Sequence, residues 1–366
     1  MHHPPMLENG AIGNRFTNPG LKLLLLLESR LGHVNQVEGL ACIIGRSTPV
    51  ELERLAVRRT FFAHEDARKL VLRYLAPDPA RWLRRLYAVD AAAVRCPDII
   101  IGSGQATIAA GILLSRHFDV PFVFSGAIEG YDTRDVALQL VNSRGRAGAA
   151  RTAYVPIPSL VDPDVLPVPR RLAVSSDLAG ADIALLIGGT AYRRDYPPAE
   201  WEALERLVGE SARQFGLRWR VSSSPRTPDE VADRFGAMYA RGEIAAFLDF
   251  RTAGAGSARA LFGADAIVVT ADSTSMLAEG LAAKRPVVAL KSSHVHKHYA
   301  DEVIAAMASG PGLAVLPLDI VTAAQFAATL LSLDAPRHDA RDLIALALAP
   351  IVNQALGVAR ARNGHS

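Results

Sequence analysis

The chain has 366 residues, of which half are hydrophobic and 21% are charged, so it can bury the core of two ordinary domains or of one large domain. Its formal net charge of +3 is too small to indicate a nucleic-acid-binding protein. The two cysteines, Cys42 and Cys96, form no spacing motif, which excludes a disulfide framework or a cysteine-based zinc site and is typical of a reducing cytoplasm.

Residues 1–19 are rich in His, Pro, Asn and Gly and predict a loose arm. The apolar run at 21–27 predicts a buried strand rather than a signal peptide, because it is short and Glu28–Ser29–Arg30 follows it instead of a small-residue cleavage site. No apolar run approaches the length needed to cross a bilayer. A helical pattern occupies 34–45. The turn between this strand and helix lies at the carboxyl edge of a sheet, where open α/β proteins bind ligands, and it holds Gly32, His33, Asn35 and Gln36.

Helical patterns follow at 64–75 and 79–89, and the second carries Arg81, Arg84 and Arg85. These arginines are typical of a solvated helix face, and they are also compatible with contact to phosphate or to an anionic membrane surface. A strand at 98–101 then leads through Ser103, Gly104 and Gln105 into a helix at 106–118. This turn lacks the third glycine of the dinucleotide fingerprint, which disfavours a Rossmann oxidoreductase. A further strand is predicted at 120–124.

Residues 126–181 are less regular and rich in proline, which predicts an inter-domain connection with a boundary near 165–180. After it, apolar strands and helical patterns alternate again. We therefore expect an α/β protein with two Rossmann-like domains that face each other across a cleft. The expected units are residues 1–170, residues 171–335, and a final helix in 336–366 that packs back on the first domain.

Three loops of the second half end strands and should meet at one edge of its sheet: 188–190, 222–227 and 270–275. They supply glycines, hydroxyl groups and helix N-termini, an inventory that suits a phosphate or diphosphate. The alternative for the hydroxyl-rich loop at 270–275 is ordinary helix capping. Arg226 could bind phosphate through two hydrogen bonds, and Glu279 could accept hydrogen bonds from a ribose; alternatively both are solvated.

The segment ADAIVVTADSTSMLAEGLAAKRPVVAL resembles the donor-site signature of GT-B glycosyltransferases. Five segments together are similar to the "elongated mitochondria" family: LGHVNQVEGL, IIIGSGQ, LIGGT, SSSPRTP and VTADSTSMLAEGLAAKRPVV. That family includes plant proteins linked to mitochondrial division and bacterial proteins described as glycosyltransferases of surface polysaccharide. Residues 45–95 and 126–180 match only loosely, so the resemblance implies nothing about the acceptor.

The resemblance implies a transferase that uses a nucleotide sugar as co-substrate, with the acceptor on the first domain. The implied donor-binding residues are Gly188, Gly189, Thr190, Ser222, Ser223, Ser224, Arg226, Thr227, Thr270, Asp272, Ser273, Ser275, Met276 and Glu279. The expected acceptor-side residues are Gly32, Asn35, Gln36, Ser103, Gly104 and Gln105. The acceptor would be a saccharide or a lipid-linked molecule.

For the chemical step, His33 or a nearby carboxylate such as Asp132 is the candidate base, because imidazole titrates near neutral pH. Alternatively, His33 only caps the helix or binds phosphate. The sequence shows no metal motif for the donor diphosphate, so we expect Arg226 and helix dipoles to replace a metal and no further cofactor to be needed. The tract His294, His296 and His298 is either a polar loop or a metal site.

Two alternatives remain open at this point: a nucleotide-sugar 2-epimerase of the same fold, and a non-catalytic adaptor that kept the fold. We expect a cytoplasmic protein that takes part in polysaccharide biosynthesis, binds no nucleic acid, and is able to touch the inner face of the membrane peripherally. The donor sugar, the nucleotide base, the stereochemical outcome and the oligomeric state do not follow from the sequence.

Overall fold

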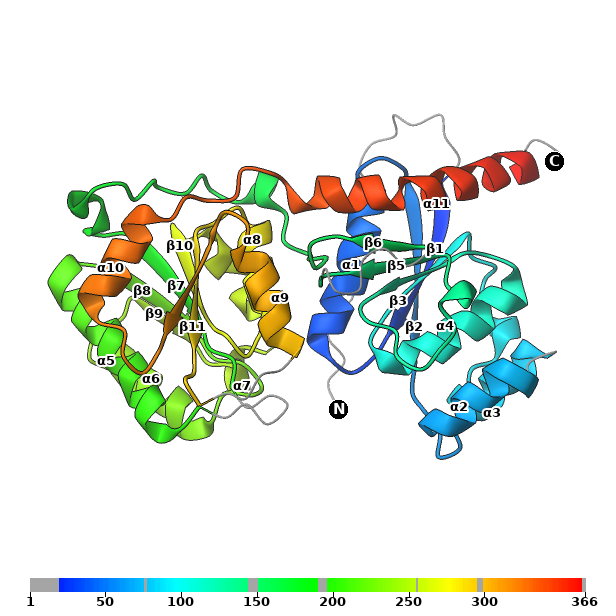
Figure 1. Cartoon of the computed structure of the whole chain (residues 1–366), viewed down its shortest axis with the longest axis horizontal. Coiled ribbons are helices and arrows are strands. Elements are labelled where there is room, and N and C mark those ends of the chain that lie inside the picture. The colour runs from blue at the N-terminus through cyan, green and yellow to red at the C-terminus, as the bar shows by residue number, and fades with distance from the viewer. Residues whose placement is uncertain are drawn as a thin grey trace.

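The computed structural model describes residues 20–75, 78–143, 151–189, 196–254, 256–294 and 299–363. In these ranges the chain forms two six-stranded sheets, each covered by helices, which lie side by side as two domains (Figure 1). Neighbouring strands run parallel throughout the described chain. The predicted α/β fold with two Rossmann-like domains is confirmed.

The first sheet has the strand order β2-β1-β3-β4-β5-β6. Its strands are β1 (Leu21–Leu27), β2 (Val50–Ala56), β3 (Ile99–Ser103), β4 (Phe122–Ser125), β5 (Leu138–Val141) and β6 (Thr152–Tyr154). Alternate leucines of β1 belong to different cores: Leu24 and Leu26 pack on one face of the sheet, and Leu23 and Leu25 on the other. Burial on both faces explains why β1 reads as a continuous apolar run.

Helices cover both faces of this sheet. Those of the first domain are α1 (Leu31–Gly45), α2 (Glu65–Leu70), α3 (Pro79–Tyr87) and α4 (Gln105–Phe118). A π-helical turn, Val71–Leu75, continues α2. Residues of α3 and α4 share the core with Leu24 and Leu26, whereas α1 shares the core with Leu23 and Leu25. Because β1 and β3 are parallel neighbours, the β1–α1 and β3–α4 turns emerge at the same edge of the sheet.

The second sheet has the order β12-β11-β10-β7-β8-β9. Its strands are β7 (Asp182–Leu186), β8 (Arg218–Ser222), β9 (Ala246–Leu248), β10 (Ala266–Thr270), β11 (Val287–Lys291) and β12 (Leu313–Pro317). Its helices are α5 (Pro198–Phe215), α6 (Asp229–Ala240), α7 (Phe250–Ala253), α8 (Thr274–Ala282), α9 (Tyr299–Ala308) and α10 (Ala323–Ser332). Counted from β7, this is the doubly wound order 3-2-1-4-5-6, and the first sheet follows the flavodoxin-like order.

The last helix, α11 (Ala340–Asn363), leaves the second domain and runs across the first (Figure 1). Ile344, Leu348 and Val352 pack into the core that contains Leu23 and Leu25. By length and composition α11 could cross a membrane, which the sequence reading did not foresee. Its mean hydropathy is high because 343–359 carries no charge, although Asn353 and Gln354 interrupt the run. The face packed on the first domain makes α11 part of that domain's core.

An ion-pair network joins the two chain segments that connect the domains. Arg341, at the start of α11, binds Asp339 at 2.7 Å and Asp164 at 2.6 Å, and it also binds Asp162. Asp162 and Asp164 belong to the connection after β6, whereas Asp339 belongs to the connection after α10. Because Arg341 is buried, this network holds the two connecting segments together at one place.

Three strands of the first sheet were missed in the sequence. β2 lies at the sheet edge, and its exposed Glu51 and Glu53 interrupt the apolar pattern. β5 and β6 lie in the segment that was interpreted as an irregular connection. They are only four and three residues long, too short for periodicity to identify them.

Candidate functional site

In each sheet the strand order reverses at one point, and the candidate site residues gather there. The reversal lies between β1 and β3 in the first sheet and between β7 and β10 in the second. Ligands of open α/β sheets bind in the crevice at the carboxyl ends of strands at such a point. The β1–α1 and β3–α4 turns therefore form one candidate half-site, and the β7 and β10 loops form the other.

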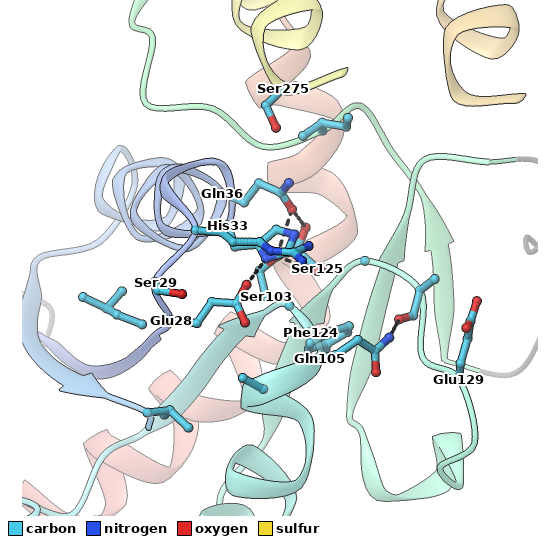
Figure 2. A pocket seen from close by; sticks show the side chains of 18 of the residues that line it. Glu28, Ser29, His33, Gln36, Ser103, Gln105, Phe124, Ser125, Glu129 and Ser275 are labelled. Carbon is cyan, nitrogen blue, oxygen red and sulfur yellow. Dashed lines mark hydrogen bonds and ion pairs between the residues drawn. The ribbon is translucent and has the colours of Figure 1, made fainter. Parts of the chain in front are cut away.

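A cavity of about 1210 Å³ opens at the edge of the first sheet and reaches the second domain. Its lining residues come from the carboxyl ends of β1 to β4, from the β5–β6 region and from α8. They include Glu28, His33, Gln36, Arg58, Arg59, Ser103, Gly104, Gln105, Ser125, Thr274 and Ser275. Figure 2 shows Ser275 approaching from the second domain above the cluster around His33. The cavity thus joins parts of both domains.

Glu28 and His33 form a hydrogen-bonded pair within this cavity (Figure 2). Nδ1 of His33 meets a carboxylate oxygen of Glu28, and the backbone N–H of Ala106 donates to the same carboxylate. Burial opposes the charge of Glu28, but the hydrogen bond and charge of His33 outweigh it, so the pKa of Glu28 lies below its ordinary value. With Nδ1 engaged, Nε2 is the ring nitrogen that remains for a substrate.

The imidazole is the more accessible member of this pair. His33 keeps 29% of its side chain exposed, against 11% for Glu28. Gly104 packs directly on the pair: a methyl group at this position would overlap both the Glu28 carboxylate and the His33 ring. Its φ of +87° is also in the region that favours glycine. Gly104 therefore allows the carboxylate and the imidazole to lie against the start of α4.

The amide of Gln36 ties α1 to the ends of two strands. Its Oε1 atom lies 2.9 Å from the Ser125 hydroxyl and 3.1 Å from the Ser103 hydroxyl. Gln105 donates from Nε2 to the carbonyl of Ala127 at 3.1 Å. Gln36, Ser103, Gly104 and Gln105 line the cavity, whereas Gly32 and Asn35, the other two residues predicted on the acceptor side, are not among its lining residues. The hydrogen bonds of Gln36, Ser103 and Gln105 hold the cavity wall together.

The three predicted loops of the second domain do meet. The hydroxyl of Thr270 accepts a hydrogen bond from the backbone N–H of Gly188 at 2.7 Å. Asp272 accepts one from Gly189 at 3.0 Å and binds Arg226 at 2.8 Å. A methyl group on Gly188 would overlap the Asp272 carboxylate, and one on Gly189 would overlap the carbonyl of Arg226. Both glycines are thus required for the close approach of the loops.

Asp272 is the buried centre of this loop cluster. Its side chain is 1% exposed, whereas the Arg226 side chain is 34% exposed. Burial raises the pKa of Asp272 above its ordinary value, although the positive charge of Arg226 acts in the opposite direction. Arg226 therefore reaches from a buried carboxylate toward solvent, and its guanidinium has further N–H groups for an anionic ligand.

Most hydroxyl groups of the second domain's loops hydrogen-bond to the protein itself. Ser224 and Thr227 donate to the carbonyl of Gly188 at 3.0 Å and 2.7 Å. Ser223 accepts from the backbone N–H of Phe250 at 2.8 Å. Two others bond locally: Ser222 donates to the carbonyl of Ser223, and Ser273 caps α8 by accepting from the N–H of Met276. These hydroxyl groups stabilise the loop conformations. A ligand would therefore be contacted mainly by backbone N–H groups.

Glu279 of α8 touches the first domain. Its Oε1 atom accepts a hydrogen bond from the Asn35 amide at 2.9 Å, although the residues are 244 positions apart. Burial raises the pKa of Glu279 to about 7, and the hydrogen bond from Asn35 acts in the opposite direction. Close by, a methyl group on Gly32 would lie 2.8 Å from the Ser275 hydroxyl. The N-terminal part of α1 and α8 thus meet across the domain interface.

Other predicted residues lie apart from the cavity or outside the described residues. Asp132 caps a short turn and binds Arg134 at 2.6 Å; it does not line the cavity. Thr190, His296 and His298 fall outside the residues that the structure describes. His294 lies 3.1 Å from the buried Glu200. Within the described ranges, no group of three His, Cys, Asp or Glu residues is placed to hold a metal ion.

Several cavity residues were not singled out in the sequence. Glu28 is the most important, because it orients the candidate base. Its position at the end of a buried strand, five residues before a histidine, is the signal that could have found it. Ser125 is the last residue of β4, and Arg58 and Arg59 follow the end of β2. β2 was missed in the sequence, and its two arginines were missed with it.

The sequence of the second domain matches a known family. Residues 169–314 match the family model described as "Mitochondrial fission ELM1". The predicted family resemblance is confirmed for this part of the chain. The matched range contains all three loops of the second domain and Glu279, but it does not extend to His33. No curated protein sequence matches the chain.

Solved structures of other proteins share the two-domain fold. UDP-GlcNAc 2-epimerase from Methanocaldococcus jannaschii is 10% identical, with a TM-score of 0.53 over 91% of this chain and 100% of that one. MurG from Acinetobacter baumannii is 12% identical, with a TM-score of 0.51 over 93% and 99%. CalG4, the calicheamicin glycosyltransferase, is 16% identical over 94% and 97%, with a TM-score of 0.47. At these identities the similarity to the epimerase and to MurG shows the GT-B-like fold alone.

Proposed function

We propose that this protein is a glycosyltransferase that moves a sugar from a nucleotide-sugar donor to a hydroxyl group of a saccharide or lipid-linked acceptor. The observation that carries the proposal is the shared cavity: Thr274 and Ser275, at the N-terminus of α8, line the same space as His33. Its volume of about 1210 Å³ exceeds the roughly 300–1,000 Å³ of a usual small-molecule pocket. It can therefore hold an acceptor beside a donor sugar.

The donor diphosphate would lie at the N-terminus of α8 and beside the loop of Gly188 and Gly189. Free N–H groups and the helix dipole favour an anion at the N-terminus of α8. Arg226 would pair with the diphosphate while it keeps its contact with Asp272. The donor ribose would bind Glu279, whose carboxylate now accepts from Asn35. Ribose hydroxyls are donors of the same kind, so they can replace the amide.

The acceptor hydroxyl would approach His33 from the first domain. Nε2 takes the hydroxyl proton while the acceptor oxygen bonds to the anomeric carbon of the donor sugar. The bond from that carbon to the diphosphate oxygen breaks, and the nucleoside diphosphate leaves with the electron pair. Glu28 stabilises the imidazolium that results, as the carboxylate does in other carboxylate–histidine pairs. In this mechanism Glu28 is a positioning residue and His33 is the base.

Charge on the leaving diphosphate is the second requirement of this step. The α8 N-terminus and the Arg226 guanidinium would stabilise this charge, because both present N–H groups and positive potential to the proposed diphosphate site. We expect transfer to proceed without a divalent cation for this reason. Activity that disappears with a chelator and returns with added magnesium would contradict this part of the proposal.

A panel of nucleotide sugars tests the proposal. A donor that binds only the native state raises the unfolding temperature, and the shift grows with donor concentration. The best donor is then incubated with and without saccharide and lipid-linked acceptors, and both products are measured. Acceptor-dependent release of the nucleoside diphosphate supports a transferase. Conversion of the donor without an acceptor would instead show an epimerase, and the absence of any thermal shift would indicate an adaptor.

A further inference from the structure

Positive charge is concentrated in one short part of the first domain. Residues 57–90 contain eight Lys and Arg residues against four Asp and Glu, a net charge of +4, whereas the whole chain carries +3. Two of the acidic residues are already paired there: Glu65 with Lys69 at 2.5 Å, and Asp90 with Arg84 at 3.2 Å. The rest of the chain is close to neutral. This segment therefore dominates the attraction of the protein to any anionic surface.

Large aromatic side chains are exposed in the same segment. Phe61 is 94% exposed and Phe62 is 57% exposed, in the loop between β2 and α2, and Tyr74 beyond α2 is 64% exposed. The loop, α2 and α3 together form the outer corner of the first domain (Figure 1). A phenyl ring with 94% of its surface in water has no packing role in the described chain. Its exposure is costly unless a partner covers it.

Arginines lie over these rings. The Arg85 guanidinium is 5.5 Å from the Phe62 ring centre and 5.8 Å from that of Trp82, and Arg73 is 5.1 Å from that of Tyr74. The backbone of Thr60 donates to the carbonyl of Leu86 at 2.9 Å, which fixes the loop against α3. Apolar rings and cationic groups are thus presented together on a defined surface. Such pairing suits a boundary with an apolar interior and an anionic rim.

The corner surface, defined as Arg58, Arg59, Phe61, Phe62, Arg73, Tyr74 and Arg85, adjoins the candidate site. Arg58 and Arg59 line the cavity, and only Thr60 separates them from Phe61. Both are exposed, and no ion pair involves either of them among the described residues. We propose that the corner surface docks on a bilayer that contains anionic lipids, with Phe61 and Phe62 inserted at the headgroup–acyl boundary. The mouth of the cavity then lies beside the membrane surface.

Charge complementarity favours an anionic bilayer as the partner of the corner surface. Anionic headgroups attract clustered arginines over a distance of roughly 8 Å at physiological salt, and the inserted rings then add apolar contact. Two adjacent rings at a loop tip provide little area for a protein interface, which buries about 800 Å² on each partner. They are sufficient for peripheral and reversible insertion. An acceptor held in the same bilayer would need no diffusion through water to reach His33.

Vesicle co-sedimentation of the full chain tests this proposal without donor or acceptor, so its result is independent of the transferase assay. We expect binding to vesicles of phosphatidylcholine mixed with phosphatidylglycerol, weak binding to phosphatidylcholine alone, and release at high salt. Phe61→Ser/Phe62→Ser should lower the partition coefficient at least tenfold, roughly the effect of removing two partly inserted rings. Arg73→Gln/Arg85→Gln should lower it by about fivefold for each charge removed.

The matched control is Leu343→Ser/Leu346→Ser on α11, where the two side chains are 52% and 74% exposed. This variant should bind vesicles like the unaltered protein. Equal thermal unfolding midpoints show that all three double variants are folded. The proposal fails if Phe61→Ser/Phe62→Ser binds normally, if the α11 variant loses binding instead, or if phosphatidylcholine alone binds equally well. Displacement by inorganic phosphate at constant ionic strength would show that the arginines bind free phosphate rather than a membrane.

Discussion

The two sheet edges that face each other are built differently. At the second sheet, hydroxyl groups hold the loops to one another: Thr270 binds Gly188, and Ser224 and Thr227 bind the same loop. At the first sheet, Glu28 and His33 face a large cavity, and the imidazole remains accessible. A rigid edge suits the binding of a donor with a constant nucleotide part, because little is lost on ordering it. An open edge suits acceptors of various shapes and leaves them beside His33, the proposed base.

This difference predicts that changes at the first edge alter turnover, whereas changes at the second edge alter stability and donor binding. His33→Ala should give the largest effect, a loss of turnover of about 10²- to 10⁴-fold, because the acceptor hydroxyl loses its base. Donor binding, measured by thermal shift or calorimetry, should stay the same. Unchanged turnover would remove His33 as the base, and lost donor binding would mean that the two edges are not separate in function.

Glu279→Gln should alter the pH dependence of stability. Burial raises the pKa of Glu279 from 4.5 to about 7. The stabilisation that protonated Glu279 gives the folded protein is therefore complete below pH 4.5 and is lost as the pH rises through 7. The variant should escape this loss and exceed the unaltered protein by about 3 kcal/mol in unfolding free energy at pH 8. Urea unfolding at several pH values measures it.

The control for that experiment is Glu243→Gln. Glu243 is exposed and paired with Arg241, and this pair lowers its pKa, so its titration lies below pH 4.5. The control profile should follow that of the unaltered protein between pH 5 and 8. If Glu279→Gln also follows it, Glu279 is ionised throughout, and its contact with Asn35 joins a charged carboxylate to the first domain.

Arg226→Ala should destabilise the second domain by roughly 1–3 kcal/mol, since the buried Asp272 carboxylate loses its partner. Donor binding should weaken in parallel. Arg241→Ala, which removes an exposed pair, should leave the unfolding midpoint in place. If Arg226→Ala is as stable as the unaltered protein but fails to bind donor, Arg226 belongs to the ligand contacts rather than to the loop scaffold.

Gly104→Ala should lower turnover about tenfold, because its methyl group displaces Glu28 and His33 by a fraction of an ångström. Gly242→Ala is a matched control: its φ is +73°, and nothing lies within 4 Å of the added methyl group. Backbone strain is about 1–2 kcal/mol for a left-handed residue such as Gly242→Ala, and it is larger at Gly104, whose ψ of 148° lies outside the left-handed helical region. Only the first should change turnover in a steady-state assay. Equal effects in the two variants would assign the loss to strain alone.

The central strands and long helices were predictable because each buries a periodic apolar face. β1 is the clearest example, since leucines fill both of its faces. The edge strand β2 was missed because its neighbour covers only one side, so charged residues such as Glu51 are tolerated in it. The short strands β5 and β6 owe their strand conformation to pairing with distant residues. A local sequence pattern does not predict such pairing.

Within the site, the sequence located the loops better than it predicted the roles of their side chains. The glycines and hydroxyls of 188–189, 222–227 and 270–275 identified three loops that do converge. Whether Ser224 faces a ligand or the Gly188 carbonyl depends on loop conformation, which spacing does not determine. The Glu28–His33 pair requires a turn that brings residues five apart together. The Asn35–Glu279 contact depends on the relative placement of two domains, and no local pattern encodes it.

The packing of α11 against β1 has a consequence for how the protein is made. Leu23 and Leu25 leave the ribosome long before Ile344 and Leu348, which pack with them in one core. Contacts so distant in sequence form late, so the first domain is completed only after the second has been synthesised. Pulse proteolysis of stalled nascent chains should show the second domain protected before α11 emerges and the first domain only afterwards. Until that moment, one apolar face of the first sheet is available to chaperones.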